Sequence, residues 1–168
     1  TQNPILHSAS WFPSRLDRAL NRAEADVIHL HWVCGETLSV ETIGRIRKPL
    51  VWTLHDMWPF CGAEHYAPAP PDARFCVGYH SKNRPAEHSG IDLDKWTWQR
   101  KRRSWRQPMH IIAPSQWLAD CARRSLLMQD WPIHVVPNPL DTELFHPVDK
   151  SWCRSLLGLP QDRPLVLF

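Results

Sequence analysis

The chain has 168 residues, 43% of them hydrophobic and 22% charged, which suits one folded domain and excludes a disordered chain. Sixteen prolines and only six glycines, with no fixed repeat, exclude collagen-like and low-complexity classes. The net charge of +3 is local, because six basic and no acidic residues lie between Lys95 and Arg106, so the rest of the chain is mildly acidic.

The cysteines and the apolar runs indicate in which cellular compartment the protein is to be expected. The five cysteines are odd in number and form no Cys-x-x-Cys pair, which argues against a disulfide framework and a zinc ribbon. No apolar run approaches the roughly 20 residues of a membrane span, and no signal segment opens the chain. We therefore expect a cytoplasmic protein, at most peripheral at the inner face of the membrane.

Both ends of the chain show strand patterns. Residues 4–7 (Pro-Ile-Leu-His) and the apolar residues 165–168 both have a strand pattern, and the second stretch stops without a turn or cap after it. We therefore expect an internal piece of a longer protein, with the start of a second domain at the C-terminal end.

Strand and helix patterns alternate between these ends. Strands are predicted at residues 26–32, 50–54, 109–113 and 133–136, and helices at 15–22, 39–47, 92–106 and 115–127. Parallel strands joined by single helices predict a doubly wound α/β fold, which is a Rossmann-like parallel sheet with flanking helices.

The first of these strands alternates in character. Ile28, Leu30 and Trp32 are predicted to share one face of it. Val27, His29 and His31 would lie on the other face, with His29 as a core histidine.

One long segment breaks the alternation. Residues 55–90 contain five prolines and follow directly on the strand at 50–54. Long loops inside a compact domain are usually functional, and open α/β sheets bind ligands beyond the carboxyl ends of their strands. Function is therefore to be sought at the start of this segment.

Histidines gather where two predicted strands end. His29, His31 and His55, with Asp56, would meet at one rim of the sheet. Such a set could bind a divalent metal, or His55 or His31 could hydrogen-bond a polar substrate. No residue pattern supplies second-shell support for a metal, so we favour hydrogen bonding and expect no metal site.

The start of the long segment also combines aromatic rings with polar groups. Sugars stack their C–H faces on aromatic rings while carboxylates and imidazoles take the hydroxyls, so a carbohydrate site is predicted. Its substrate-binding candidates are Asp56, Trp58, Glu64, His65 and Tyr66. The alternative is that Trp58 and Phe60 only anchor the loop to the core.

The basic helix predicted at residues 92–106 carries Trp98 and Trp105, seven residues apart and hence on one face. It is compatible with nucleic acid, with anionic lipid headgroups, or with a packed tryptophan stripe under a solvated charged face. The chain has neither a glycine-rich phosphate loop nor a Gly-x-Ser-x-Gly elbow, which disfavours a nucleotide cradle of the usual kind and a serine hydrolase.

Four stretches in order carry a family resemblance. They are Asp26-Val27-Ile28-His29-Leu30-His31-Trp32, Thr53-Leu54-His55-Asp56-Met57-Trp58-Pro59-Phe60, Pro114-Ser115-Gln116-Trp117-Leu118 and Val136-Pro137-Asn138-Pro139-Leu140-Asp141-Thr142-Glu143-Leu144-Phe145. Together they resemble bacterial glycosyltransferases of family 4.

The resemblance implies the GT-B architecture of two Rossmann-like domains facing each other, and sugar transfer with retention of configuration. The donor would be a nucleotide sugar acting as co-substrate, with no cofactor and no metal. Residues 1–137 would be the acceptor-side domain without its N-terminal part, 138–163 the interdomain connection, and 164–168 the first strand of the donor domain. The family's N-terminal glycine-rich loop and its Glu-x7-Glu segment are absent from this sequence.

Residue by residue, the resemblance implies that His55 contacts the transferred sugar, that His31 lies at a second position facing it, and that Asn138 lies on the donor side. The expected function is a retaining glycosyltransferase of the hexosyl type in surface polysaccharide synthesis, inactive as this fragment. Its acceptor would be a glycan or a lipid-linked molecule, with the helix Lys95–Arg106 near an anionic membrane and no nucleic acid as partner. The rival is a non-catalytic module that binds glycan or nucleic acid.

Overall fold

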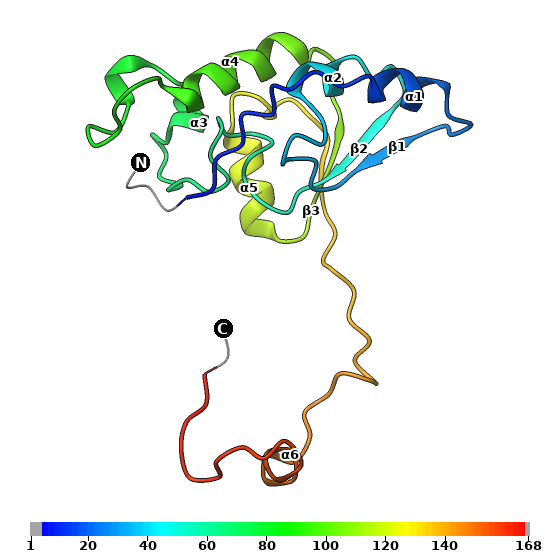
Figure 1. Cartoon of the computed structure of the whole chain (residues 1–168), viewed down its shortest axis with the longest axis vertical. Helices are drawn as coiled ribbons and strands as arrows, with labels where there is room; N and C mark the ends of the chain where they lie inside the picture. Colours follow the sequence, from blue (N-terminus) through cyan, green and yellow to red (C-terminus); the bar gives the residue numbers. More distant parts are fainter. Residues whose placement is uncertain (1–4, 167–168) are drawn as a thin grey trace. The chain divides into compact units, whose positions relative to one another are not determined.

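A computed structural model describes residues 5–166 of the chain (Figure 1). These residues fall into two compact units that divide between Pro137 and Asn138. The first unit contains the sheet and most of the helices. The second contains a single helix, α6 (Lys150–Leu156), whose cap residue Asp149 accepts a hydrogen bond from the backbone N–H of Trp152.

The first unit is built on a four-stranded sheet, in which all neighbouring strands are parallel and the order is β1-β2-β3-β4. The strands are β1 (Ile28–Leu30), β2 (Leu50–Thr53), β3 (His110–Ala113) and β4 (Ile133–Val135). The helices are α1 (Leu16–Arg22), α2 (Val40–Gly44), α3 (Arg74–Val77), α4 (Leu93–Ser104) and α5 (Gln116–Arg124), with a 3-10 turn, η1 (Ser81–Asn83). The predicted Rossmann-like α/β fold with flanking helices is confirmed.

Side-chain caps set where three of these helices begin. Ser39, Asp92 and Ser115 each accept a hydrogen bond from a backbone N–H in the first turn of α2, α4 and α5, respectively. Such caps satisfy donors that the helix itself leaves unpaired. Helices α2 and α4 pack side by side (Figure 1).

The predicted strands at the two ends are not part of the sheet. Pro4 lies outside the described residues, and His7 makes only a single antiparallel bridge to Glu64, so the opening strand was wrong. At the other end, Leu165 and Val166 are not in a strand, and residues 167–168 lie outside the described part. The long segment 55–90 is mostly loop, interrupted by α3 and η1.

The two faces of the sheet differ. Ile28, Leu30 and Ile111 point into the buried core, whereas His29, His110 and His134 are exposed on the other face. The strand order advances in one direction, and right-handed crossovers of that kind place their helices on one face. For the part of the chain that the structure describes, the prediction of a doubly wound sheet and that of His29 as a core histidine were therefore wrong.

A tryptophan cluster with a buried lysine forms the centre of the core. The ring centroids of Trp52 and Trp58 lie 5.5 and 6.1 Å, respectively, from that of Trp105. The Nζ of Lys101 lies 3.6 Å from the centroid of Trp58 and donates hydrogen bonds to the carbonyls of Trp58, of Cys61 at 3.1 Å and of Gly62 at 2.7 Å. Burial lowers the pKa of Lys101, while the three carbonyls and the ring face are partners suited to an ammonium group.

Helix α4 therefore does not expose all of its basic side chains to solvent, because some of them are buried in the core. Arg100 is buried too, and it pairs with Glu41 of α2 at 2.6 Å while its guanidinium also binds the carbonyls of Ala9 and Ser10. Trp98 of α4 and Trp105, the residue that caps its C-terminal end, are both buried, as the packed-stripe interpretation requires. Four of the six basic residues of Lys95–Arg106 remain at least partly accessible to solvent.

Replacing Lys101 by Met should lower the free energy of unfolding by about 3 kcal/mol, because buried carbonyls would lose their charged donor. Chemical denaturation of the purified chain measures this change. Arg103→Met, at an exposed position two residues along the same helix, is the matched control and should stay within about 0.5 kcal/mol of the wild type. Equal midpoints and slopes for Lys101→Met and the wild type would contradict a stabilising role for the buried ammonium.

Candidate functional site

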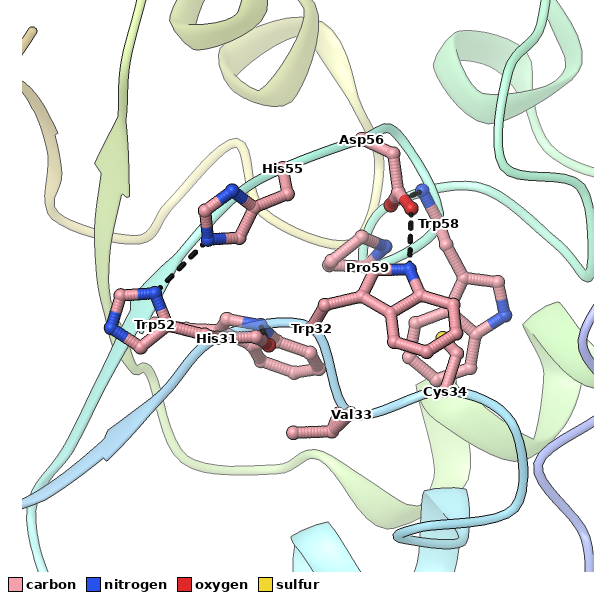
Figure 2. Close-up of a pocket in the computed structure, with 9 residues that line it drawn as sticks. All are labelled: His31, Trp32, Val33, Cys34, Trp52, His55, Asp56, Trp58 and Pro59. Atoms are coloured by element: carbon pink, nitrogen blue, oxygen red, sulfur yellow. Dashed lines mark hydrogen bonds between the residues drawn. The ribbon is translucent and has the colours of Figure 1, made fainter. Parts of the chain in front are cut away.

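A small pocket lies at the carboxyl ends of β1 and β2 (Figure 2). It is lined by residues 31–34, which follow β1, by Trp52 of β2, and by residues 55, 56, 58 and 59 of the loop after β2. The two neighbouring strand ends thus bring together segments more than twenty residues apart in the chain. This is the position at which parallel α/β sheets bind ligands.

Two exposed imidazoles meet at the rim of this pocket. Nδ1 of His31 lies 3.0 Å from Nε2 of His55, and the two ring centroids are 5.3 Å apart (Figure 2). A hydrogen bond between these nitrogens needs one donor and one acceptor, so the pair shares one proton there. Nε2 of His31 and Nδ1 of His55 are left to serve a ligand, and the structure thus brings the two predicted catalytic residues together.

His29 extends this row of rings on the open face of the sheet. Its ring centroid lies 4.5 Å from that of His31, and its Nε2 is 2.8 Å from Oγ1 of Thr53. Partial desolvation by the neighbouring groups, followed by the charge of His31, lowers the pKa of His29. His29 therefore favours its neutral form beside the pair.

Asp56, the next residue after His55, is buried and bonded on both carboxylate oxygens. Oδ1 accepts from the backbone N–H of Trp58 at 2.9 Å. Oδ2 accepts from the indole N–H of Trp32 at 3.1 Å and lies 2.5 Å from Nδ1 of His65. These bonds make Asp56 a support for the rim.

His65 continues the chain of hydrogen bonds inward, with its Nε2 2.8 Å from Oγ of Ser8. The order serine, histidine, aspartate is that of a hydrolase triad, but Ser8 and His65 are only 8% and 1% exposed. A hydroxyl enclosed in this way is not offered to a substrate. The three residues tie the N-terminal segment to the loop.

Glu64, the neighbour of His65 in the chain, is also buried. The hydroxyl of Tyr79 donates to its Oε1, and burial, strengthened by the neighbouring Asp94 carboxylate, raises the pKa of Glu64 to about 8. Glu64 therefore holds a proton at neutral pH. Its Oε1 is bound by Tyr79, and Glu64 is not among the residues that line the pocket.

The remaining predicted residues are distributed differently. Trp58 has no exposed surface and donates its indole N–H to the carbonyl of Ser8 at 2.9 Å, which supports the alternative that it anchors the loop. Tyr66 is 56% exposed but does not line the pocket. Asn138 belongs to the second unit, and its donor-side role stays a prediction.

Cys34 borders the pocket without offering a nucleophile. Burial raises the pKa of its thiol to about 12, so the thiolate is scarce at neutral pH. Among residues 5–166, no group of three or more His, Cys, Asp or Glu side chains is placed to hold a metal ion. In the same range, no helix combines the length and apolar character needed to cross a bilayer.

One pocket residue was missed as a binding candidate. Trp32 was expected to share the buried face of Ile28 and Leu30, but β1 ends at Leu30 and Trp32 is 49% exposed. Its position in the sequence could have marked Trp32 as a binding candidate, because His31-Trp32 follows β1 much as His55-Asp56 follows β2.

A comparison of the sequence with protein-family models identifies the family of the chain. The model for Glycosyltransferase Family 4 matches residues 2–144, which is most of the chain. The chain belongs to glycosyltransferase family 4. Comparisons with curated proteins and with solved structures gave no significant match. The family 4 resemblance carried by the four sequence stretches is thereby confirmed.

The buried Glu64 generates a pH-dependent prediction. Its pKa is higher in the folded chain, at about 8, than its usual 4.5, so the stability that its proton supplies is complete at low pH and is lost as the pH rises towards 8. Glu64→Gln keeps the shape without titrating. Relative to the wild type, the variant should gain about 1.4 kcal/mol for each pH unit between about pH 5 and pH 8.

Denaturant unfolding of both proteins across this pH range measures the difference. A difference between variant and wild type that stays constant with pH would show that Glu64 is already ionised in the folded chain.

Proposed function

We propose that this family 4 chain forms the acceptor-side domain of a retaining GT-B glycosyltransferase. In this proposal, the enzyme moves a hexose from a nucleotide sugar to a glycan or lipid-linked acceptor in surface polysaccharide synthesis. Residues 138–163 connect the two domains, and residues 164–168 begin the donor-binding domain.

The observation that carries the proposal is the exposed His31–His55 pair at the carboxyl edge of the sheet. An imidazole can both donate and accept a hydrogen bond, and near neutral pH it can change its charge. His55 is proposed to contact the transferred sugar through Nδ1. His31 fixes the orientation of the His55 ring through their shared hydrogen bond and offers its own Nε2 to a neighbouring hydroxyl.

Replacing His55 by Ala in the full-length enzyme should lower the transfer rate about 100-fold, because a positioned hydrogen-bonding group at the reacting sugar is lost. His110→Ala is the matched control, since His110 is also exposed on the open face of the sheet but lies at the start of β3. Circular dichroism should show both variants folded. Full turnover by His55→Ala would remove His55 from the site.

Membrane attachment is proposed through the accessible basic residues of α4 and of the segment directly after it, which are Lys95, Arg102, Arg103 and Arg106. Clustered basic side chains are attracted to anionic headgroups. This assigns the enzyme to the cytoplasm and the inner face of the membrane, where a lipid-linked acceptor would be met. Arg100 and Lys101 contribute little to this attraction, because they are buried and engaged within the protein.

Sedimentation with liposomes tests the attachment. The chain should sediment with phosphatidylglycerol vesicles but not with phosphatidylcholine vesicles, and added salt should weaken the binding. Changing Arg102, Arg103 and Arg106 together to Gln should abolish it. Equal sedimentation with both lipids, or an unchanged triple variant, would contradict the proposal.

A further inference from the structure

Trp32 differs from the other tryptophans of the pocket in its exposure. Three tryptophans line the pocket, and two of them, Trp52 and Trp58, are only 1% and 0% exposed. Trp32 is 49% exposed and directly follows His31 in the chain. It is therefore the one of the three whose ring is available to a ligand beside the histidine pair.

The ring of Trp32 is also held in place. Its indole N–H donates to Oδ2 of Asp56 (Figure 2), and the same oxygen is bound by His65, whose other nitrogen binds Ser8. All three supporting residues are buried. An exposed side chain fixed by a buried network has little conformational entropy left to lose when a ligand binds.

The backbone next to Trp32 adds to this support. Gly35 has a φ of +62°, a left-handed conformation that favours glycine, and a Cβ at this position would come within 3.6 Å of Cη2 of Trp32. The turn after β1 therefore passes close to the far edge of the indole ring. The N–H edge of the ring is fixed by Asp56.

We propose that Trp32 is a stacking platform for a pyranose ring of the acceptor. The ring's C–H face would lie on the indole, and an edge hydroxyl would reach the free Nε2 of His31, which leaves Nδ1 of His55 to the transferred sugar. Stacking on an aromatic face, with a few placed polar groups for orientation, is how such sites bind sugars. The assignment of this ring to the acceptor rests on the proposed function. The role of Asp56, His65 and Ser8 is to position the platform.

The direct test uses the chain labelled with 5-fluorotryptophan and observed by fluorine NMR. The Trp32 signal is identified by its loss in Trp32→Phe. The probes are methyl β-glucopyranoside, methyl β-galactopyranoside and methyl α-mannopyranoside at millimolar concentrations. At least one should shift the Trp32 signal in a saturable way.

Trp117 supplies the matched control, because it is 55% exposed on α5 and does not line the pocket. Its signal, identified in Trp117→Phe, should not move. If no glycoside shifts the Trp32 signal, or if Trp32 and Trp117 shift alike, the platform is overturned. A Trp32 signal that no glycoside shifts would indicate that another part of the protein covers the ring.

Kinetics of the full-length enzyme separate this inference from the proposed function. Trp32→Ala should raise KM for the acceptor about tenfold and leave KM for the nucleotide sugar unchanged, with Trp32→Phe in between. If Trp32→Ala still transfers sugar and its KM for the acceptor is unchanged, the stacking role of Trp32 is overturned while the proposed function stands. Saturable glycoside binding at Trp32 in an enzyme without transferase activity would support the platform and overturn the proposed function.

Discussion

The buried ammonium of Lys101 is the interaction on which the site depends. It reaches from α4 across the core to three backbone carbonyls of residues 58–62, and it lies against the face of Trp58. This stretch has no regular secondary structure to hold it. Because the lysine fixes the loop a few residues after β2, the preceding His55 and Asp56 are held at the edge of the sheet. The helix, the loop and the rim are therefore coupled through one charged group.

The polar and aromatic residues of the segments after β1 and β2 divide into two sets with different roles. Asp56, Glu64 and His65 are buried and bonded to other protein groups, so they shape the loop and orient its neighbours. His31, Trp32 and His55 are exposed and leave ring nitrogens or ring surface open. Asp56 and His65 have partners at all their polar side-chain atoms, and a network satisfied in this way can specify one conformation. These bonds direct the exposed set towards the same space. Recognition of a sugar is thereby proposed to rest on the second set, supported by the first.

Much of the fold followed from the sequence, because apolar runs and helix caps are local signals. The strand-end rule also placed His31 and His55 together, since neighbouring parallel strands end at the same edge. What could not be predicted depends on contacts between distant residues. The bond between Ser8 and His65 spans 57 positions, and nothing local shows that Lys101 points inward from a run of basic residues. A loop rich in aromatic and polar groups has the same composition whether those groups face a sugar or each other, so Trp58 and Glu64 could not be distinguished from true contact residues.

A crystal structure of the chain with a bound methyl glycoside tests the central claim most directly, which is that the rim after β1 and β2 is a sugar-binding surface held from below. The account predicts a pyranose ring against the indole of Trp32, with a hydroxyl at hydrogen-bond distance from His31 or His55 and the loop at residues 58–62 still bound to Lys101. A sugar seated elsewhere, with the rim empty and the loop detached from Lys101, would contradict it.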